Sequence, residues 1–311
     1  MMNSIEGYLF VTFTGEEEDG EQIYLALSRD GFYWQDLNGG KPVLRSGIGE
    51  KGVRDPFLLR SPDGNRYYLM ATDLRIGSGR SWEDARSHGS RSIIVWESED
   101  LLRWSGPRSC ELGTEASGCV WAPEAVYSPE KKAYMVFWSS FFGGRHQICR
   151  AYTRDFRTFE QKGLYLEQPY DVIDMTIIRD GGQYYRFYKN EQEKYLCMDY
   201  GSDLEGLFTP IESSGLRNRT GVEGPALFPL KENGWCLLVD QFASGGGYIP
   251  LLGESLWEGR FRGMQKGQYD MGTLKKRHGS VLPLDKNEYG AVRDAYGAVD
   301  AFACNGEETK Q

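Results

Sequence analysis

The sequence predicts an all-β fold, a five-bladed β-propeller made of four-stranded antiparallel blades. Three observations support this: a strand-rich composition, a hairpin pattern that occurs four times, and a second strand pattern that occurs five times. Aromatic residues make up 14% of the 311 residues, which include 39 glycines and 12 prolines, as expected for many short strands joined by tight turns. We expect a single domain over residues 1–311, with a core from about 7 to 296.

The hairpin pattern joins two apolar, β-branched or aromatic segments through a polar turn. Its four copies span Asp55 to Asp73, Glu124 to Ser139, Asp174 to Asn190 and Glu223 to Gln241. Gly, Asp, Asn and Pro occupy turns such as residues 62–65 and 180–182. The flanking segments carry the side chains expected of strands packed on both faces.

The second pattern contains a strand, a Ser or Thr, an acidic residue, and an aromatic residue ahead of an edge strand. Its five copies begin at Ile23, Ile93, Ile148, Tyr195 and Ile249. One sheet cannot bury both faces alone, so repeats of about 50 to 70 residues with four strands each should stack around an axis. The five copies predict five blades.

The two ends of the chain predict how the ring closes. The segment from Gly279 to Leu284 resembles an innermost strand without a following partner, and the segment from Tyr8 to Phe13 resembles a second strand with nothing before it. We expect both in one closing blade. Asp285 and Glu288 then form a capping-box-like start, and the apolar spacing that follows predicts a short C-terminal helix.

Charge and sequence patterns disfavour several classes of protein. Lys and Arg number 36 against 45 Asp and Glu, a net charge of −9, which disfavours nucleic acids and anionic membranes as partners and leaves neutral ligands such as sugars. No signal-peptide pattern and no apolar stretch of roughly 18 residues is found, so we expect a cytoplasmic protein. The six cysteines lack metal-ligand spacing and are expected to be free thiols.

A carboxylate precedes or begins an inner strand in every hairpin, at Asp55, Glu124, Asp174 and Glu223. Because first strands begin and second strands end on the same face of a propeller, we expect all four at one mouth of the channel. Like charges in a partly dry funnel push their pKa values apart, so such a group can supply an acid and a base at one pH. Arg54 should point away and form packing or ion-pair contacts.

Five motifs in this order and spacing resemble glycoside hydrolase family 43: Val53-Arg54-Asp55-Pro56, Trp121-Ala122-Pro123-Glu124, Ile173-Asp174, Glu223-Gly224-Pro225 and Arg277-His278-Gly279-Ser280-Val281. The resemblance spans roughly residues 7 to 296 and implies a five-bladed propeller that cleaves arabinofuranosides or xylosides with inversion. It implies that Asp55 is the general base, Glu223 the general acid, and Asp174 the carboxylate that orients the acid and tunes its pKa. Glu124 departs from the Asp that is frequent in arabinanase-like relatives, which leaves the substrate open.

The chemistry of inversion suits these assignments. A protonated carboxyl must face the leaving oxygen while an ionised one holds water on the opposite face, roughly 6.5 to 9.5 Å away. We expect the charge of Asp174 to raise the pKa of Glu223. Two alternatives for Asp174 stay open: Asp171 could take its role, or Asp174 could form a buried ion pair with Arg54 or Arg277.

Further residues at the mouth are expected to contact substrate: Trp82, Trp121, Glu124, Phe141, Asn190, Gln241, Phe242, Arg277 and His278. The aromatic members are candidate sugar-stacking platforms, with blade packing as the alternative. His278 could hold a water or a structural cation, calcium or sodium, in the channel, although no cofactor is required. His88 and His146 are expected in surface loops.

The long connection from Leu74 to Arg91 should wall off one side of the pocket and favour removal of terminal sugars. The expected activity is that of an inverting exo-glycosidase acting on arabinose- or xylose-containing plant oligosaccharides, foremost an α-L-arabinofuranosidase. A β-D-xylosidase, an exo-galactosidase and a non-catalytic carbohydrate-binding propeller are the alternatives. A retaining fructosidase is disfavoured, because its Asn-Asp-Pro-Asn-Gly and Glu-Cys motifs are missing.

Overall fold

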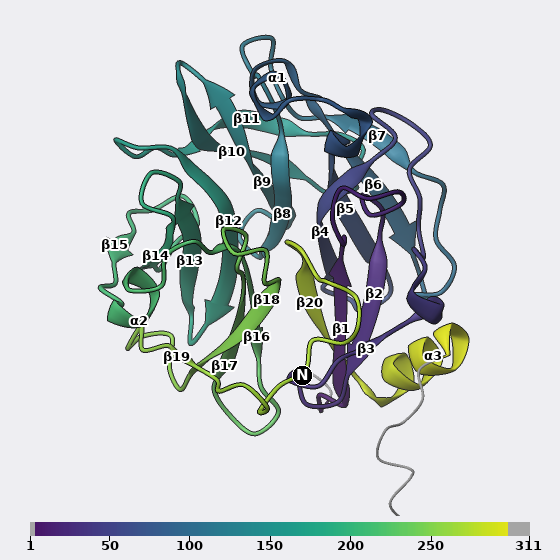
Figure 1. Cartoon of the computed structure of the whole chain (residues 1–311). Coiled ribbons are helices and arrows are strands. Elements are labelled where there is room, and N and C mark those ends of the chain that lie inside the picture. The colour runs from purple at the N-terminus through teal and green to yellow at the C-terminus, as the bar shows by residue number, and fades with distance from the viewer. Residues whose placement is uncertain (1–3, 298–311) are drawn as a thin grey trace, which may run out of the picture.

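The computed structural model describes residues 4–297 and confirms a five-bladed propeller of four-stranded antiparallel sheets around a central axis (Figure 1). The innermost strands are β4 (Val53–Arg60), β8 (Trp121–Ser128), β12 (Val172–Asp180), β16 (Glu223–Pro229) and β20 (Ser280–Leu284). Each contacts the next, and β20 contacts β4, so the five strands form a closed ring. Blades are numbered here by these strands, I to IV for β4, β8, β12 and β16, with β20 in the closing blade.

The other strands follow outward from the axis in chain order. They are β5 (Tyr67–Asp73), β6 (Ser92–Ser98) and β7 (Arg108–Glu111) in blade I; β9 (Ala133–Phe142), β10 (Arg145–Thr153) and β11 (Glu160–Leu166) in blade II; β13 (Gln183–Asn190), β14 (Tyr195–Gly201) and β15 (Thr209–Pro210) in blade III; and β17 (Trp235–Asp240), β18 (Tyr248–Gly253) and β19 (Arg262–Gly263) in blade IV. All four predicted hairpins are therefore confirmed.

The closing blade combines both ends of the described chain, as expected. Strand β20 pairs with β1 (Gly7–Thr12), which continues to β2 (Tyr24–Ser28) and β3 (Gln35–Asp36). Helix α3 (Lys286–Tyr296) follows β20 and begins with the predicted capping box: the Asp285 carboxylate accepts from the Glu288 amide, and the Glu288 side chain accepts from the Asp285 amide.

The apolar core lies between neighbouring blades. One cluster, for example, joins Met70 and Val95 of blade I to Val136 and Ala151 of blade II, and similar clusters fill the other blade interfaces. Each sheet thus buries its faces against two neighbours, which explains why the unit that folds is the ring.

Four innermost strands carry a β-bulge near their first residues, where the register with the second strand shifts. The bulged residues have left-handed backbone conformations: Asp55 (φ 49°), Ala122 (φ 47°), Asp174 (φ 53°) and Gly224 (φ 56°). For residues other than glycine this costs of order 1–3 kcal/mol each, and such strain concentrates at functional sites. The bulges make Asp55 and Asp174 equivalent positions, whereas Glu223 lies one residue before its bulge and Glu124 two residues after.

Short helices account for the main differences from the sequence-based expectation. The connection 74–91 contains η2 (Ile76–Ser78) and α1 (Trp82–His88), and α1 begins at Ser81, whose hydroxyl accepts from the Asp84 amide. The helices η1 (Asn38–Gly40) and α2 (Ser214–Arg217) were also not expected.

The expectation for His146 was wrong, because this residue lies on β10 and is buried. His88 is exposed, although it ends α1 instead of lying in a loop. The five cysteines within residues 4–297 are free thiols, as expected, and Cys304 lies outside the described residues. Over the same residues, no helix combines the length and apolar character needed to cross a bilayer.

Candidate active site

Asp55 is held at the channel mouth by two neighbours. The Thr72 hydroxyl at the end of β5 donates to Asp55 Oδ2 at 2.8 Å and accepts from the Ala122 amide at 2.7 Å. His278 Nδ1 lies 3.5 Å from Asp55 Oδ1. One carboxylate oxygen is therefore fixed by blade I, and the other faces the histidine ahead of β20.

Asp174 lies deeper and is buried. Its Oδ2 accepts from the Gly224 amide at 3.2 Å and lies 3.7 Å from His278 Nδ1, so one imidazole nitrogen faces both Asp55 and Asp174. Burial raises the pKa of Asp174 to about 7; the charges of Glu223 and Asp55 add to the rise, while His278 and Lys189 oppose it. The protonated form of Asp174 therefore persists to a higher pH than that of an ordinary carboxyl.

Glu223 is held between two cations at the start of β16. Lys189 Nζ donates to Oε2 at 2.8 Å, and Arg277 Nη2 donates to Oε1 at 3.2 Å. Burial raises the pKa of Glu223, but Lys189 and Arg277 outweigh it, and the net shift is downward. The expected rise of the Glu223 pKa is therefore wrong; among the three candidate catalytic carboxyls, the pKa of Asp174 is raised instead.

The two alternatives for Asp174 find no support. Asp171 accepts instead from the backbone amide of His146 at 2.5 Å, with the His146 ring 3.2 Å away. Arg54 pairs with Glu21 at 2.9 Å, as expected for a packing residue that points away from the mouth. Its guanidinium also lies over the Phe13 and Trp82 rings.

Arg277 forms ion pairs with two carboxylates of the protein. Besides Glu223, it donates through Nε to Asp240 Oδ2 at 2.6 Å. Its position favours a role in holding Glu223 and Asp240 over direct contact with substrate.

Tyr248 and Gly224 fix the backbone around His278. The Tyr248 hydroxyl donates to the Gly224 carbonyl at 2.6 Å and accepts from the Gly279 amide at 3.0 Å. A Cβ on Gly224 would lie 2.7 Å from the His278 ring, and its φ of 56° also disfavours side chains. Any side chain at position 224 would therefore displace the His278 ring.

A recurring contact, not expected from the sequence, links four of the five second strands to the next blade. A polar residue at the same register near the end of β5, β9, β13 or β17 reaches the bulge region, or its equivalent before β20, in the following blade. The four residues are Thr72, Ser139, Lys189 and Asp240, and the groups that they bind are the Ala122 amide, the Asp174 amide, the Glu223 carboxylate and the Arg277 guanidinium. Their shared place at the end of the second hairpin strand marks them in the sequence as positions expected to govern specificity, but it does not predict that they contact the next blade.

Glu124 does not lie at the rim, which corrects the expectation for it. Its side chain is buried, Oε2 has no hydrogen-bond partner, and Thr176 is a hydrogen-bonding neighbour. Burial raises the pKa of Glu124 well above its usual range, with the Thr176 hydrogen bond opposing and the Asp174 charge adding to the rise. Burial thus favours the protonated form of Glu124, which lies two residues beyond the bulge and not at the mouth.

An aromatic wall, formed by Trp82, Trp121, Phe141 and His146, joins α1 to blade II. Trp82 is half exposed and meets the Trp121 ring edge-on at 6.0 Å; the His146 ring lies 5.1 Å from Trp121 and 5.2 Å from Phe141. The connection 74–91 thus packs beside the start of β8.

The remaining residues expected at the mouth form hydrogen bonds with the nearby backbone or contact Lys189. The Asn190 amide oxygen accepts from the amides of Gln192 and Glu193, so Asn190 shapes the turn after β13. The Gln241 amide donates to the Gly247 carbonyl at 3.4 Å. The Phe242 ring lies 3.9 Å from Lys189 Nζ.

Cys119, His146 and Asp171 are arranged in the order of a nucleophilic triad, but their environment opposes that chemistry. Cys119 Sγ lies 3.9 Å from His146 Nε2 and is completely buried. Burial raises the pKa of this thiol to about 12, so the nucleophilic thiolate is not populated at neutral pH.

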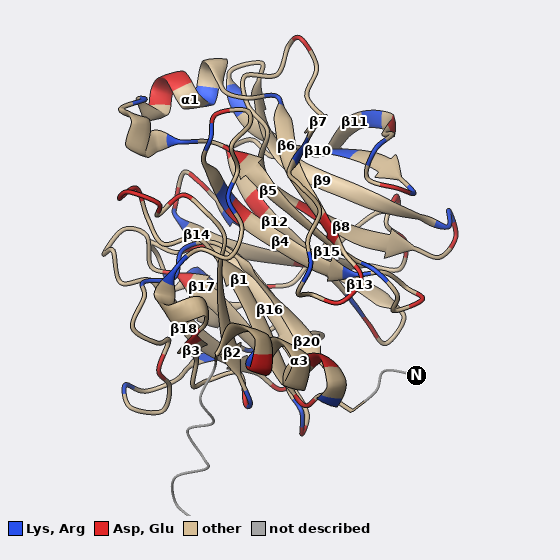
Figure 2. Ribbon diagram, turned by 90° about the vertical axis from the view of Figure 1, so that its right-hand side faces the viewer, with Lys and Arg blue, Asp and Glu red and all other residues tan. Residues whose placement is uncertain are grey.

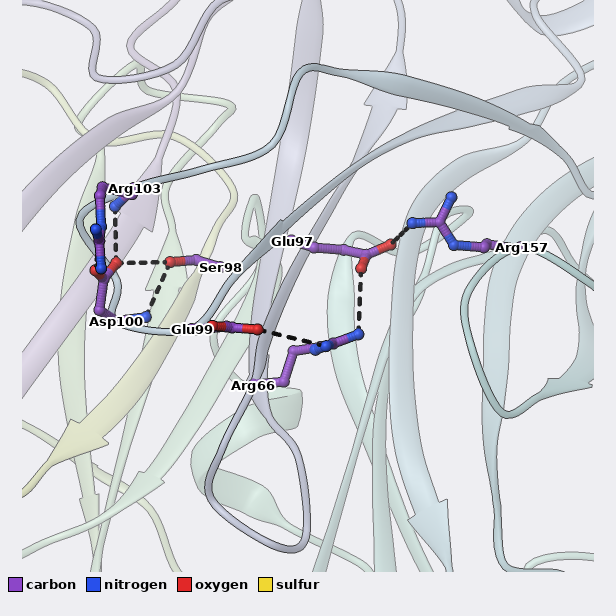
Figure 3. Close-up of a pocket in the computed structure, with 7 residues that line it drawn as sticks. All are labelled: Arg66, Glu97, Ser98, Glu99, Asp100, Arg103 and Arg157. Carbon is purple, nitrogen blue, oxygen red and sulfur yellow. Dashed lines mark hydrogen bonds and ion pairs between the residues drawn. The ribbon is translucent and has the colours of Figure 1, made fainter.

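Charged residues also gather away from the mouth. Figure 2 shows acidic positions on the strands in the middle of the molecule and mixed charges on the loops. A surface pocket at the other end of blade I is lined by Arg66, Glu97, Ser98, Glu99, Asp100, Arg103 and Arg157 (Figure 3). Its charges pair with one another, for example Arg157 with Glu97 at 2.9 Å, so it offers no free acid or base.

Within residues 4–297, no group of three or more His, Cys, Asp or Glu has the arrangement of a metal site. A cation beside His278 would need water molecules among its ligands, and it stays a prediction.

Comparison with known proteins agrees with this geometry. The model of a family described as a probable glycosyl hydrolase domain, related to glycoside hydrolase family 43, matches residues 3–290. An α-L-arabinofuranosidase of Bifidobacterium longum subsp. longum is 35% identical over 210 residues, which are 60% of this chain and 20% of that protein. The chain thus spans about a fifth of the length of this relative.

Solved structures share the fold at low sequence identity. An exo-1,5-α-L-arabinanase from a bovine ruminal metagenomic library has a TM-score of 0.56 at 14% identity, covering 80% of this chain and 93% of that one. A family 43 β-1,3-galactosidase bound to galactodeoxynojirimycin has a TM-score of 0.57 at 10% identity, covering 89% and 96%. With the family model matching nearly the whole described chain, these findings establish that the protein is a glycoside hydrolase belonging to family 43.

Proposed function

We propose that the chain is an inverting, exo-acting glycosidase that removes terminal α-L-arabinofuranosyl residues from plant-derived oligosaccharides. The observation that carries the proposal is the meeting of Asp55, Asp174 and Glu223, from three blades, around His278 and Arg277. Asp55 and Glu223 are held by different neighbours, which suits their separate proposed roles as base and acid.

In the proposed reaction, Asp55 accepts a proton from a water molecule whose oxygen bonds to the anomeric carbon. Glu223 donates its proton to the leaving oxygen as the glycosidic bond breaks, so charge and protons balance within one step. Thr72 and His278 hold Asp55, and Lys189 and Arg277 hold Glu223. Inversion requires base and acid to lie roughly 6.5 to 9.5 Å apart, because water must fit between the base and the sugar.

The choice of sugar is supported by the Bifidobacterium relative, whose name is that of an α-L-arabinofuranosidase. Exo action is supported by the connection 74–91, because α1 and the aromatic wall stand on one side of the mouth and leave less room for a continuing chain. A β-D-xylosidase and an exo-galactosidase are the alternative activities of the same fold.

A panel of 4-nitrophenyl glycosides tests the proposed substrate: α-L-arabinofuranoside, β-D-xyloside and β-D-galactoside. We expect the arabinofuranoside to be cleaved fastest, with a first product of inverted anomeric configuration by NMR. A linear arabino-oligosaccharide should release only monosaccharide at early times. Preference for another glycoside would reassign the sugar, and early internal fragments would refute exo action.

A further inference from the structure

The ion pairs of Glu223 conflict with its proposed role. A general acid must carry a proton when the leaving group departs, yet both Glu223 oxygens accept hydrogen bonds from cations in the substrate-free chain. The groups that act on it from all sides are Lys189, Asp174, Arg277, His278, Asp240 and Tyr248. Of the cations among them, Arg277 is also tied to the buried Asp240, whereas Lys189 has a second carboxylate within reach.

That second carboxylate is Glu191, in the turn that follows β13. Its Oε2 is buried and forms an ion pair with Lys189 Nζ at 2.6 Å, shorter than the 2.8 Å contact of Lys189 with Glu223, although the pair lacks the angles of a hydrogen bond. Lys194 contacts the other oxygen, and Asn190 caps the turn, so Glu191 is held in place. Lys189 therefore shares its charge between two carboxylates, and Glu191 can accept a full hydrogen bond from the ammonium group once Glu223 releases it.

Lys189 is suited to a short movement without solvent exposure. Its side chain is 1% exposed, and its ammonium lies against the Phe242 ring, which offers a favourable surface in either position. Rotation at the end of the side chain changes only which carboxylate receives the hydrogen bond.

We propose that Lys189 is a movable counterion of the acid, shared between Glu223 and Glu191 in the free enzyme and left to Glu191 alone when the glycosidic oxygen of the substrate occupies its place beside Glu223. This inference rests on the proposed role of Glu223 as general acid. Until the leaving oxygen takes it, Asp174 and Glu223 together hold one proton: on Asp174 while Lys189 also pairs with Glu223, and on Glu223 once Lys189 pairs with Glu191 alone. One O–H bond breaks and one forms, and no further reactant is needed.

The pH dependence of kcat/KM tests the proposal with the methyl glycoside of the sugar identified by the panel, because a methanol leaving group requires an acid. In Lys189→Met the alkaline limb should move to higher pH by about one unit, the typical effect of removing a neighbouring cation. In Glu191→Gln it should move to lower pH, because Lys189 then has only Glu223 as its carboxylate partner. Opposite shifts from two variants are not expected of a merely structural role.

Arg186→Met is the matched control, because it removes another buried cation of β13, one paired with Asp199 at 2.7 Å and in no contact with Glu223. Its alkaline limb should stay in place. Glu191 is partly exposed, so Glu191→Gln should fold even if Lys189→Met does not. An unmoved or upward-shifted limb in Glu191→Gln would overturn the proposal.

Glu223→Gln separates this inference from the proposed function beneath it. If Glu223 is the acid, this variant should lose activity on the methyl glycoside and largely retain it on the nitrophenyl glycoside, whose leaving group needs no proton. Equal losses would remove the acid role itself. Suppose instead that Glu223→Gln behaves as expected but the alkaline limb of the pH profile stays in place in Lys189→Met and Glu191→Gln. Glu223 would then remain the acid, and only the proposal that Lys189 is a movable counterion would be refuted.

Discussion

At the scale of single residues, Asp174 shows how function opposes stability. Burial raises its pKa to about 7, so the folded chain disfavours its ionised form. The unfolded carboxyl titrates near its usual value of roughly 4. Stability from this group is therefore greatest in acid and decreases as the pH rises from there through about 7. Above that range, the protein retains a buried charge that only its neighbours compensate.

Replacing Asp174 by Asn should therefore stabilise the fold at pH 8 while removing activity. Asn keeps an acceptor for the Gly224 amide and removes the buried charge. The expected gain is on the order of 1–3 kcal/mol at pH 8, disappearing toward pH 4. Thermal unfolding of both proteins at the two pH values measures it. If the variant is less stable than the parent at both pH values, the neighbours of Asp174 stabilise its buried charge better than its raised pKa indicates.

At the scale of elements, the hairpins and the carboxylates at strand starts could be predicted, because they follow from alternating side chains and turn residues. The bulges could not, since one extra residue in a strand leaves no local mark in its sequence. Glu124 illustrates the consequence: it matches Asp55 in its place before an apolar run, yet the bulge at Ala122 moves it into the channel. The partnership of Lys189 with Glu223 was also out of reach, because it joins two blades.

The bulges of β8 and β16 should respond differently to substitution. Gly224→Ala should reduce activity on the order of 10²-fold, because its Cβ would displace His278 and misplace the carboxylates that this ring faces. Ala122→Gly is the control at the equivalent bulge, where glycine accepts the positive φ without a clash. Assays of both variants under saturating substrate make the comparison. Similar activities would mean that His278 needs no fixed position.

At the scale of the whole molecule, the ring is closed by both backbone and side chains. Strand β20 pairs with β1, and α3 then returns to blade I. Glu288, the residue that completes the capping box, also accepts from Arg60 Nε at 2.8 Å and Nη2 at 2.6 Å, and it contacts the Tyr67 hydroxyl. One carboxylate thus links the helix start, the closing blade and the first blade, at the end of β20 opposite the active site.

Glu288→Ala should therefore lower the stability of the ring without affecting the chemistry. The change leaves a partly buried guanidinium without its carboxylate and opens the capping box, at a cost of about 2–3 kcal/mol, or roughly 5 °C in Tm. Glu254→Ala is the matched control, because the Glu254 pair with Arg262 has a similar length of 2.9 Å but is almost fully exposed, and its loss should leave Tm unchanged. Calorimetry of both variants, with activity measured at 25 °C, distinguishes the two sites. Equal Tm values would mean that pairing of β1 with β20 closes the propeller by itself, and that the contacts of α3 with blade I contribute nothing to its stability.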